Sequence, residues 1–184
     1  MPQYPLSQSQ SLQQFQQLHP IRQIRAHQAF TLLEMLCVIA IIAILSALAL
    51  PSWQFRTVRL QIEAALPLAD IPKAKIAEQW ALTQTLPADN AAVGLPSPDK
   101  YVSNHIQSLT IKDGVIHLRF GNSASNILKD KVISLRPAVV DDAPIVPVAW
   151  ICDKATVPDK MTVRGDNQTT VPAGFMPLFC LAKK

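Results

Sequence analysis

The feature that most constrains this chain is an apolar run from Phe30 to Trp53 that contains a single charged side chain, Glu34. As a helix, this run is about 36 Å long, enough to cross a membrane hydrocarbon core of about 30 Å. A carboxylate inside a membrane costs several kcal/mol, so Glu34 requires a positively charged partner. A new amino group made by cutting the chain before Phe30 would lie close by. We therefore expect a membrane-anchored precursor that is cleaved there and then assembles through its anchors.

The segment before the apolar run, residues 1–29, is too polar to bury a core. It is rich in glutamine and contains only scattered apolar side chains, so we predict a disordered leader that is removed. Arg22 and Arg25 lie close to the start of the apolar run, which predicts a cytoplasmic N-terminus because basic residues favour that side. Arg56 and Arg59, on the far side of the run, weaken this bias.

Three parts are predicted: the leader, a membrane helix over residues 30–53, and a head domain over residues 54–184 outside the cytoplasm. The net charge is +4, and Arg22 and Arg25 of the leader supply two of these charges. The chain without its leader is therefore only weakly basic, which gives little support for a nucleic-acid partner.

The first part of the head continues the helical pattern. Its apolar residues recur near helical spacing: Ile62, Leu66, Ala69, Ile76 and Trp80. We expect this half of the helix to pack on the head domain. Proline removes a backbone donor and disturbs the preceding turn, so we expect Pro51 to kink or loosen the helix, and Pro67 and Pro72 to cause breaks or kinks. The helix should end by Leu86-Pro87.

The second part of the head changes to strand patterning. The predicted strands are Leu109–Lys112, Val115–Phe120, Lys131–Arg136 and Ile145–Cys152. Asp113-Gly114 separates the first two, and this dipeptide favours the type I′ turn of a hairpin. Pro147 predicts an edge position or a bulge for the fourth strand. Residues 153–179 show little periodicity. The sequence thus predicts an α+β fold, with a long helix on a four-stranded antiparallel sheet.

The three cysteines differ in context. Cys37 lies in the apolar run, where a thiol behaves as a small hydrophobic group. Cys152 and Cys180 lie in a head predicted to be outside the cytoplasm, so we expect a disulfide between them; the alternative is two unrelated thiols. The bond would stabilise the head by about 3–4 kcal/mol in the loop-entropy model.

With these residues placed, the chain resembles a type IV pilin precursor of Gram-negative bacteria. The resemblance rests on Ala29-Phe30-Thr31-Leu32-Leu33-Glu34, Pro51, Leu95-Pro96, Asp113-Gly114, Phe120-Gly121, Trp150-x-Cys152 and Cys180. It covers nearly the whole chain from Phe30 to Cys180. Two features depart from the family pattern: Ala29 stands where glycine is usual, and the leader is long and glutamine-rich.

The resemblance implies a structural protein with no enzymatic activity, cofactor or metal. A prepilin peptidase would cut between Ala29 and Phe30, and the new amino group of Phe30 would be methylated. The subunit would wait in the inner membrane and then join other pilin subunits in an extracellular filament. There Glu34 would pair with the terminal amine of a neighbouring subunit, and Pro51 would allow the helix to deform locally during packing. Adhesion, twitching motility and DNA uptake are the functions that the family implies.

Several other interpretations are open. Within the family, the alternative to a major pilin is a minor pilin or a type II secretion pseudopilin, although Trp150-x-Cys152 and the cysteine pair favour a true pilin. Outside the family, the apolar run would be a signal peptide cut after Ala49, or an uncut anchor. The chain would then be a secreted or anchored binding module that never polymerises. Either of these leaves Glu34 without a dedicated partner.

Other candidate sites are weak. His105 and His117 have no companions at ligand spacing, which argues against a metal or catalytic site, and we expect His117 to face solvent. Asn167-Gln168-Thr169 matches a glycosylation sequon, a short pattern that is common by chance. Because some pilins take part in DNA uptake, DNA is a candidate further partner of this chain. A host surface is another. The residues available for a basic DNA-binding face are Arg119, Lys129, Lys131, Arg136, Lys154, Lys160 and Arg164.

Overall fold

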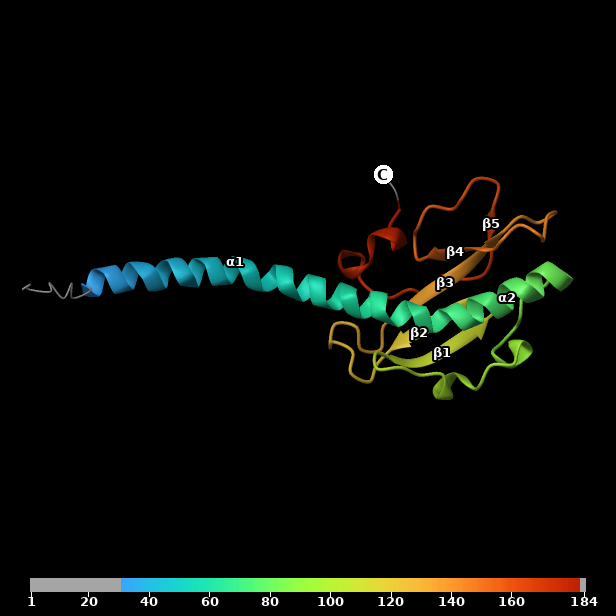
Figure 1. Ribbon diagram of the computed structural model, residues 1–184, viewed down its shortest axis with the longest axis horizontal. Coiled ribbons are helices and arrows are strands. Elements are labelled where there is room, and N and C mark those ends of the chain that lie inside the picture. The colour runs from blue at the N-terminus through green and yellow to red at the C-terminus, as the bar shows by residue number, and fades with distance from the viewer. Residues whose placement is uncertain (1–30, 183–184) are drawn as a thin grey trace, which may run out of the picture. The chain divides into compact units, whose positions relative to one another are not determined.

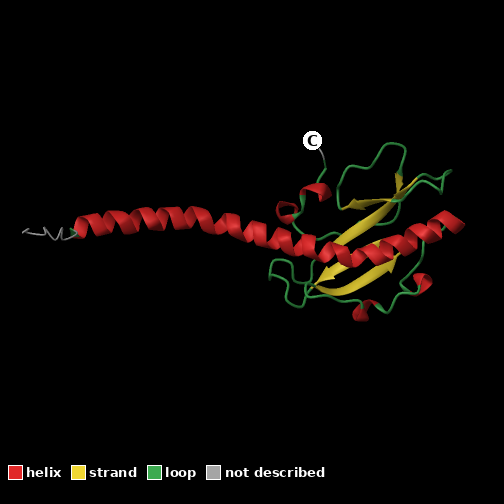
Figure 2. Ribbon diagram, in the orientation of Figure 1, coloured by secondary structure: helices red, strands yellow, loops and turns green. Residues whose placement is uncertain are grey.

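The computed structural model describes residues 31–182, except for the side chains of residues 50–52. The predicted leader and the cleavage site between Ala29 and Phe30 lie outside this range. The chain divides into two units, Met1–Ala43 and Ile44–Lys184, and the second contains the whole α+β head. Figures 1 and 2 show its helices and strands.

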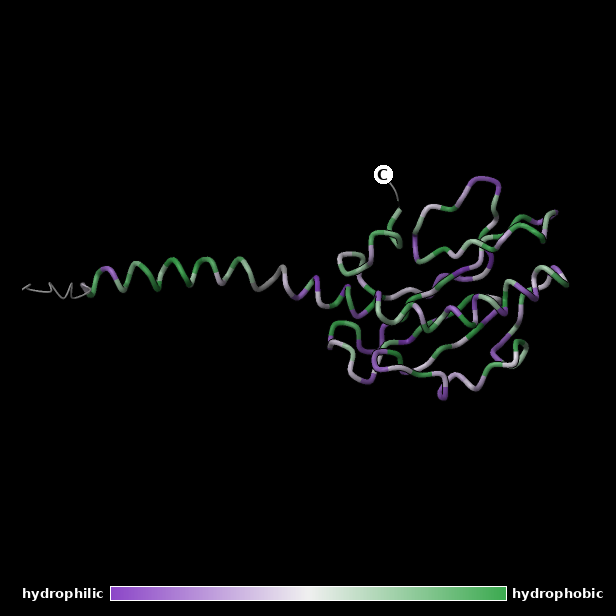
Figure 3. The backbone as a smooth tube through the Cα atoms, in the orientation of Figure 1, coloured by the Kyte–Doolittle hydropathy of each residue, from purple (hydrophilic) through white to green (hydrophobic). Residues whose placement is uncertain are grey.

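The long helix α1, Leu32–Ala65, runs without interruption through Pro51. The predicted kink at that proline stays a prediction. Within the described residues, one helix is long and apolar enough to cross a membrane, judged by length and composition. Figure 3 shows its N-terminal part as a nearly continuous hydrophobic stretch.

The predicted breaks occur after α1. A short 3₁₀-helix, Leu66–Ala69, carries Pro67 in its first turn, and α2, Asp70–Thr83, follows it directly. The prediction of a break at Pro67 is confirmed. Pro72 lies in the first turn of α2, where a missing backbone donor costs no helical hydrogen bond, so it does not interrupt the helix. Gln84 ends α2 in a left-handed conformation, with φ of 54°.

The sheet is antiparallel and larger than predicted. Its strands are β1 (Ile106–Lys112), β2 (Val115–Phe120), β3 (Val132–Val139), β4 (Ala149–Cys152) and β5 (Thr162–Val163). The order is β1-β2-β3-β4, and β5 pairs with the end of β3. The fourth strand lies at an edge, as Pro147 predicted, but it begins two residues after that proline. The predicted hairpin is confirmed, since Asp113 and Gly114 both have positive φ.

Two features of the sheet differ from the prediction. Strand β3 continues to Val139, beyond the predicted end at Arg136, because Ala138 and Val139 find partners in the unpredicted β5. Strand β5 is held in place by Asp141, whose carboxylate pairs with Arg164 and accepts a hydrogen bond from the hydroxyl of Thr162. Residues 153–179 are therefore more ordered than their composition indicates.

The core lies between the helices and one face of the sheet. Its helical residues include Val58, Ile62, Ala65, Ala69 and Ile76, and its strand residues include Leu109, Ile111, Ile116, Leu118, Ile133 and Leu135. Figure 1 shows α1 and α2 crossing the strands. The part of α1 that enters this core is the part predicted to pack on the head.

The connector between α2 and β1 covers the free edge of β1. The side chain of Asn90 accepts a hydrogen bond from the Ile111 amide (2.7 Å) and donates to the carbonyls of Leu109 (3.0 Å) and Pro96 (3.1 Å). The side-chain amide of Asn90 thus forms the hydrogen bonds with β1 that the backbone of a neighbouring strand would form. Edge strands that are covered in this way do not recruit further strands.

Candidate functional site

The first turn of α1 holds the one carboxylate of the apolar run. Thr31 caps the helix: its hydroxyl accepts the amide of Glu34 (3.2 Å), and its carbonyl accepts the amide of Met35 (3.2 Å). The spacing Thr31-x-x-Glu34 is that of a capping box, a pattern that predicts a helix start at this position from the sequence. A carboxylate in the first turn is stabilised by the positive end of the helix.

The carboxylate of Glu34 is exposed, and it forms no ion pair with any residue in the described range. Phe30, whose amino group was predicted as its partner group, lies outside the described residues. The pairing of Glu34 with a terminal amine is therefore still a prediction.

The apolar part of α1 is uncovered on all sides. The exposed residues are Leu32, Leu33, Met35, Leu36, Val38, Ile39, Ile41, Ile42, Ile44, Leu45 and Leu48. Cys37 is also exposed among them, with a free thiol. A helix that is hydrophobic all round is stable only when lipid or other protein covers it. This surface therefore needs a membrane or other chains.

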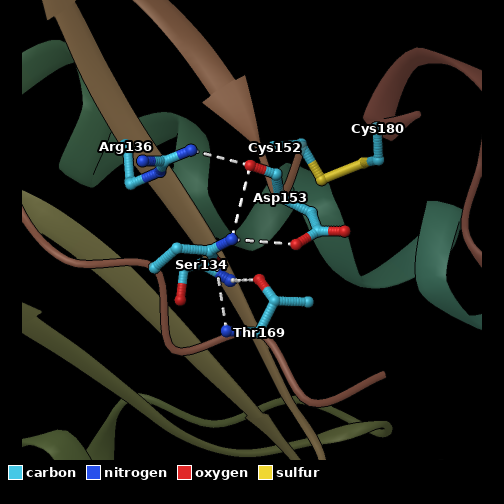
Figure 4. The surroundings of a disulfide bond; sticks show 7 residues. Ser134, Arg136, Cys152, Asp153, Thr169 and Cys180 are labelled. Atoms are coloured by element: carbon cyan, nitrogen blue, oxygen red, sulfur yellow. Dashed lines mark hydrogen bonds between the residues drawn. A yellow bond between two sulfur atoms is a disulfide. The ribbon is translucent and has the colours of Figure 1, made fainter. Parts of the chain in front are cut away.

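The C-terminal part of the head is closed by the predicted disulfide. Cys152 ends β4, Cys180 lies in a short 3₁₀-helix, and both are buried, with Cα atoms 4.7 Å apart. Figure 4 shows the polar contacts beside this bond. The guanidinium of Arg136 donates to the carbonyl of Asp153 (2.8 Å), and the side-chain amide of Asn167 donates to the carboxylate of Asp153 (2.9 Å).

A segment without strand assignment extends the sheet inside this closed region. Ser134 donates its amide to the Thr169 hydroxyl (3.1 Å), and its own hydroxyl accepts the amide of Gln168 (2.9 Å). Val132 and Thr170 exchange two further bonds, each 2.9 Å long. Along the first half of β3, bonds that involve side-chain oxygens thus take the place of the backbone hydrogen bonds that a neighbouring strand would form. This segment has no periodic pattern of apolar residues that would have predicted a strand.

The position of His117 corrects the expectation that it faces solvent. It is 7% exposed, and its Nδ1 lies 2.9 Å from the Ser134 hydroxyl. The second face of the sheet is covered here by the chain around Gly165, where a side chain would clash with Val115. Burial is the main cause that lowers the pKa of His117; Lys112 lowers it further, and Asp166 partly opposes them.

The closed region also packs on α1. The rings of Phe55 and Phe175 stack with centroids 4.8 Å apart, and the guanidinium of Arg59 donates to the carbonyl of Gly174 (3.5 Å). The disulfide-closed region is therefore joined both to the sheet and to the helix that carries the apolar surface.

Three of the remaining candidate residues bond to groups within the head. Within residues 31–182, no cluster of His, Cys, Asp and Glu is suited to a metal ion. Of the proposed basic face, Arg136 donates to the carbonyl of Asp153 and Arg164 pairs with Asp141. The amide of Asn167, the sequon residue, is engaged by Asp153.

Comparison with known proteins gives consistent matches. A family model for pilin, the subunit of a bacterial filament, matches residues 58–180, and one for the prokaryotic N-terminal methylation motif matches residues 24–50. A fimbrial protein of Neisseria meningitidis serogroup B is 30% identical over 70% of this chain and 74% of its own length. The type IV major pilin protein PilE1 of Neisseria gonorrhoeae is 34% identical over 70% of this chain and 73% of its own.

Proposed function

Because this chain belongs to the pilin family, we propose that it is the structural subunit of a type IV pilus, a filament built from copies of the chain. The observation that carries this function is the uncovered apolar surface of α1, which needs other chains or lipid around it. The disulfide-closed head supplies the surface of the filament. The protein acts structurally and catalyses no reaction.

The proposed route begins with a precursor in the inner membrane of a Gram-negative bacterium. A prepilin peptidase cuts between Ala29 and Phe30, removing the leader of residues 1–29, and Phe30 is then N-methylated. The match of the methylation motif across this position supports the step. The subunit is held by residues 30–53 until it is extracted into the filament, with residues 54–184 as its head.

Glu34 is the proposed assembly residue. Its charge lies one turn from the new N-terminus, in a surface that is otherwise apolar, and filament packing would remove that surface from water. A buried charge without a partner is strongly destabilising, whereas an ion pair with a neighbouring subunit's terminal amine compensates it. Pro51 supplies local flexibility to the helix during packing.

The first experiment is to shear filaments from the cells and measure the intact mass and N-terminal sequence of this chain. We expect N-methylated Phe30 at the N-terminus and this chain as the predominant filament protein. A chain that begins at Leu50 would indicate an exported soluble protein, and one that retains Met1 would indicate a plain anchor. Either result, or a trace amount of the chain in the filaments, would contradict the proposal.

The assembly role is tested with Glu34→Gln, which keeps the side-chain shape and removes the charge. We expect filaments to be lost while the membrane-bound subunit stays at its normal level. Normal incorporation of this variant would show that the charge is not needed for assembly.

The filament is proposed to serve adhesion to a host surface, twitching motility or DNA uptake. Deletion of the chain, with complementation, would separate these roles by measuring surface attachment, colony spreading and transformation in the same strains. At least one should fall with the loss of filaments and return with the wild-type chain.

A further inference from the structure

In the proposed membrane-held subunit, helix geometry gives the depth of each residue near the end of the apolar run. A hydrocarbon core of about 30 Å takes about 20 helical residues, which counted from Phe30 end near residue 50. The headgroup region on that side adds about 5–7 Å, or roughly four more residues. Trp53 lies within this region, and the ring of Phe55 reaches back into it because helical side chains point toward the helix N-terminus.

The C-terminal end of the disulfide-closed region meets α1 at this depth. The rings of Phe55 and Phe175 stack with centroids 4.8 Å apart, and Arg59, one turn further along α1, donates to the carbonyl of Gly174 at 3.5 Å. Figure 1 shows this segment beside α1, at the end of the head from which the helix emerges. Phe175 therefore lies at about the depth of Phe55.

Large apolar side chains at this end of the head are exposed. Leu178 is 76% exposed and Phe179 is 58% exposed, although they belong to the same short 3₁₀-helix as the buried Cys180. On α1, Trp53 is 76% exposed and Phe55 is 48% exposed. Neighbouring exposed residues of this size indicate an interaction surface, and tryptophan is enriched at membrane interfaces.

Basic side chains lie at the depth of the lipid phosphates. Arg56 is exposed and begins only about 1.5 Å beyond Phe55, so its guanidinium can extend back to the headgroups. Arg59 follows one turn later. These are the two basic residues that weaken the charge bias across the apolar run. Contact with phosphates on the far side of the membrane accounts for their position.

We infer that this end of the head docks on the surface of the phospholipid bilayer while the subunit is held in the membrane. The docking surface, the membrane collar, consists of Trp53, Phe55 and Arg56 of α1 and Phe175, Leu178 and Phe179 of the C-terminal segment. Lipid is the partner because the collar is continuous with the apolar run that lipid already surrounds. The apolar side chains enter the interface, and Arg56 binds the phosphates.

The membrane collar rests on the proposed function and adds a property to its membrane-held stage. A single helix anchors the chain but leaves the head free to tilt over the bilayer. A second contact through the C-terminal segment restricts that motion. The Cys152–Cys180 bond joins this segment to β4, so lipid contact at Leu178 and Phe179 fixes the orientation of the whole sheet.

The test measures depth with nitroxide labels on the full chain in vesicles of phosphatidylethanolamine and phosphatidylglycerol. Leu178→Cys, in a Cys37→Ala background, reports on the collar. Ile145→Cys in the same background is the control, because Ile145 is 91% exposed in the connection between β3 and β4, toward the other end of the head. We expect the collar label to collide with a water-soluble nickel chelate about three- to tenfold less often than the control, because lipid excludes polar reagents. Peptide mapping checks that Cys152–Cys180 is intact.

Equal collision rates at Leu178→Cys and Ile145→Cys would overturn the membrane collar. Shielding that is lost when the lipid-to-protein ratio is raised would also overturn it, because another subunit would then be the covering surface. A label on the native Cys37, which is exposed in the apolar run, separates this inference from the proposed function. If Cys37 is shielded and the collar label is not, the membrane-held subunit stands and only the collar is wrong. If Cys37 is also accessible to the chelate, the membrane anchor itself fails.

Discussion

The side chain of Asn90 gives the sharpest test of how the head is held together. It is 5% exposed and donates to the carbonyls of Leu109 and Pro96 while accepting the amide of Ile111. Asn90→Asp is nearly isosteric and keeps the acceptor. It replaces the donor with an oxygen that faces two carbonyl oxygens.

The cost follows from these contacts. Two hydrogen bonds are lost, and leaving a buried acceptor unsatisfied costs about 1–3 kcal/mol. Leu109 is fully buried, so water cannot replace the lost donor there. Adding the desolvation of the new carboxylate, we expect Asn90→Asp to lower the free energy of unfolding by about 3–5 kcal/mol near neutral pH. The deficit should shrink in acid, because burial raises the pKa of a carboxyl and its protonated form can donate again.

The assay is urea unfolding of the full chain in detergent, at neutral and acidic pH, with Asp89→Asn as the control. Asp89 is an exposed neighbour that accepts one hydrogen bond from the Ala92 amide, so its change should cost less than about 1 kcal/mol. An Asn90→Asp chain within about 1 kcal/mol of the wild type at neutral pH would refute the edge-covering role of the amide. A loss in the free energy of unfolding that is the same at neutral and acidic pH would also refute it.

Three further predictions concern the disulfide-closed region and His117, the histidine of β2 that this region covers. Replacing Cys152 and Cys180 by alanine should lower the free energy of unfolding by about 3.6 kcal/mol, as the loop-entropy model gives for a separation of 28 residues, measured by urea unfolding. Phe175→Ala removes the ring stacked on Phe55 and should cost about 1–2 kcal/mol and speed proteolysis of the C-terminal region, with an unchanged cleavage rate counting against the contact. Because burial lowers the pKa of His117, the unfolded chain binds a proton first as the pH falls. The free energy of unfolding should therefore decline below about pH 6.5 until the lowered pKa is passed, and His117→Gln should remove that part of the pH dependence.

Local chemistry made much of the fold predictable. Pro67 ends α1 and Asp113-Gly114 forms the hairpin because each acts through its own backbone geometry, with little help from distant residues. The segment around Thr169 was not predictable in this way. It is held by side-chain oxygens bonded to β3 about 35 residues away, and such bonds leave no periodic pattern in the sequence. His117 was misplaced for the same reason, because the chain that covers it comes from this segment.

Glu34 was chosen on energetic grounds alone, and its assembly role stays a prediction. A single carboxylate in a long apolar run needs a partner whatever the fold, which is why Glu34 could be chosen from sequence. Leu60, Ile71 and Leu82 are exposed, but their residue types do not distinguish them from core residues until the structure shows which side of the helix is buried. Apolar residues on opposite faces also cancel in any measure of amphipathicity, so the helix of the head has a weaker periodic signal than one that packs on one side only.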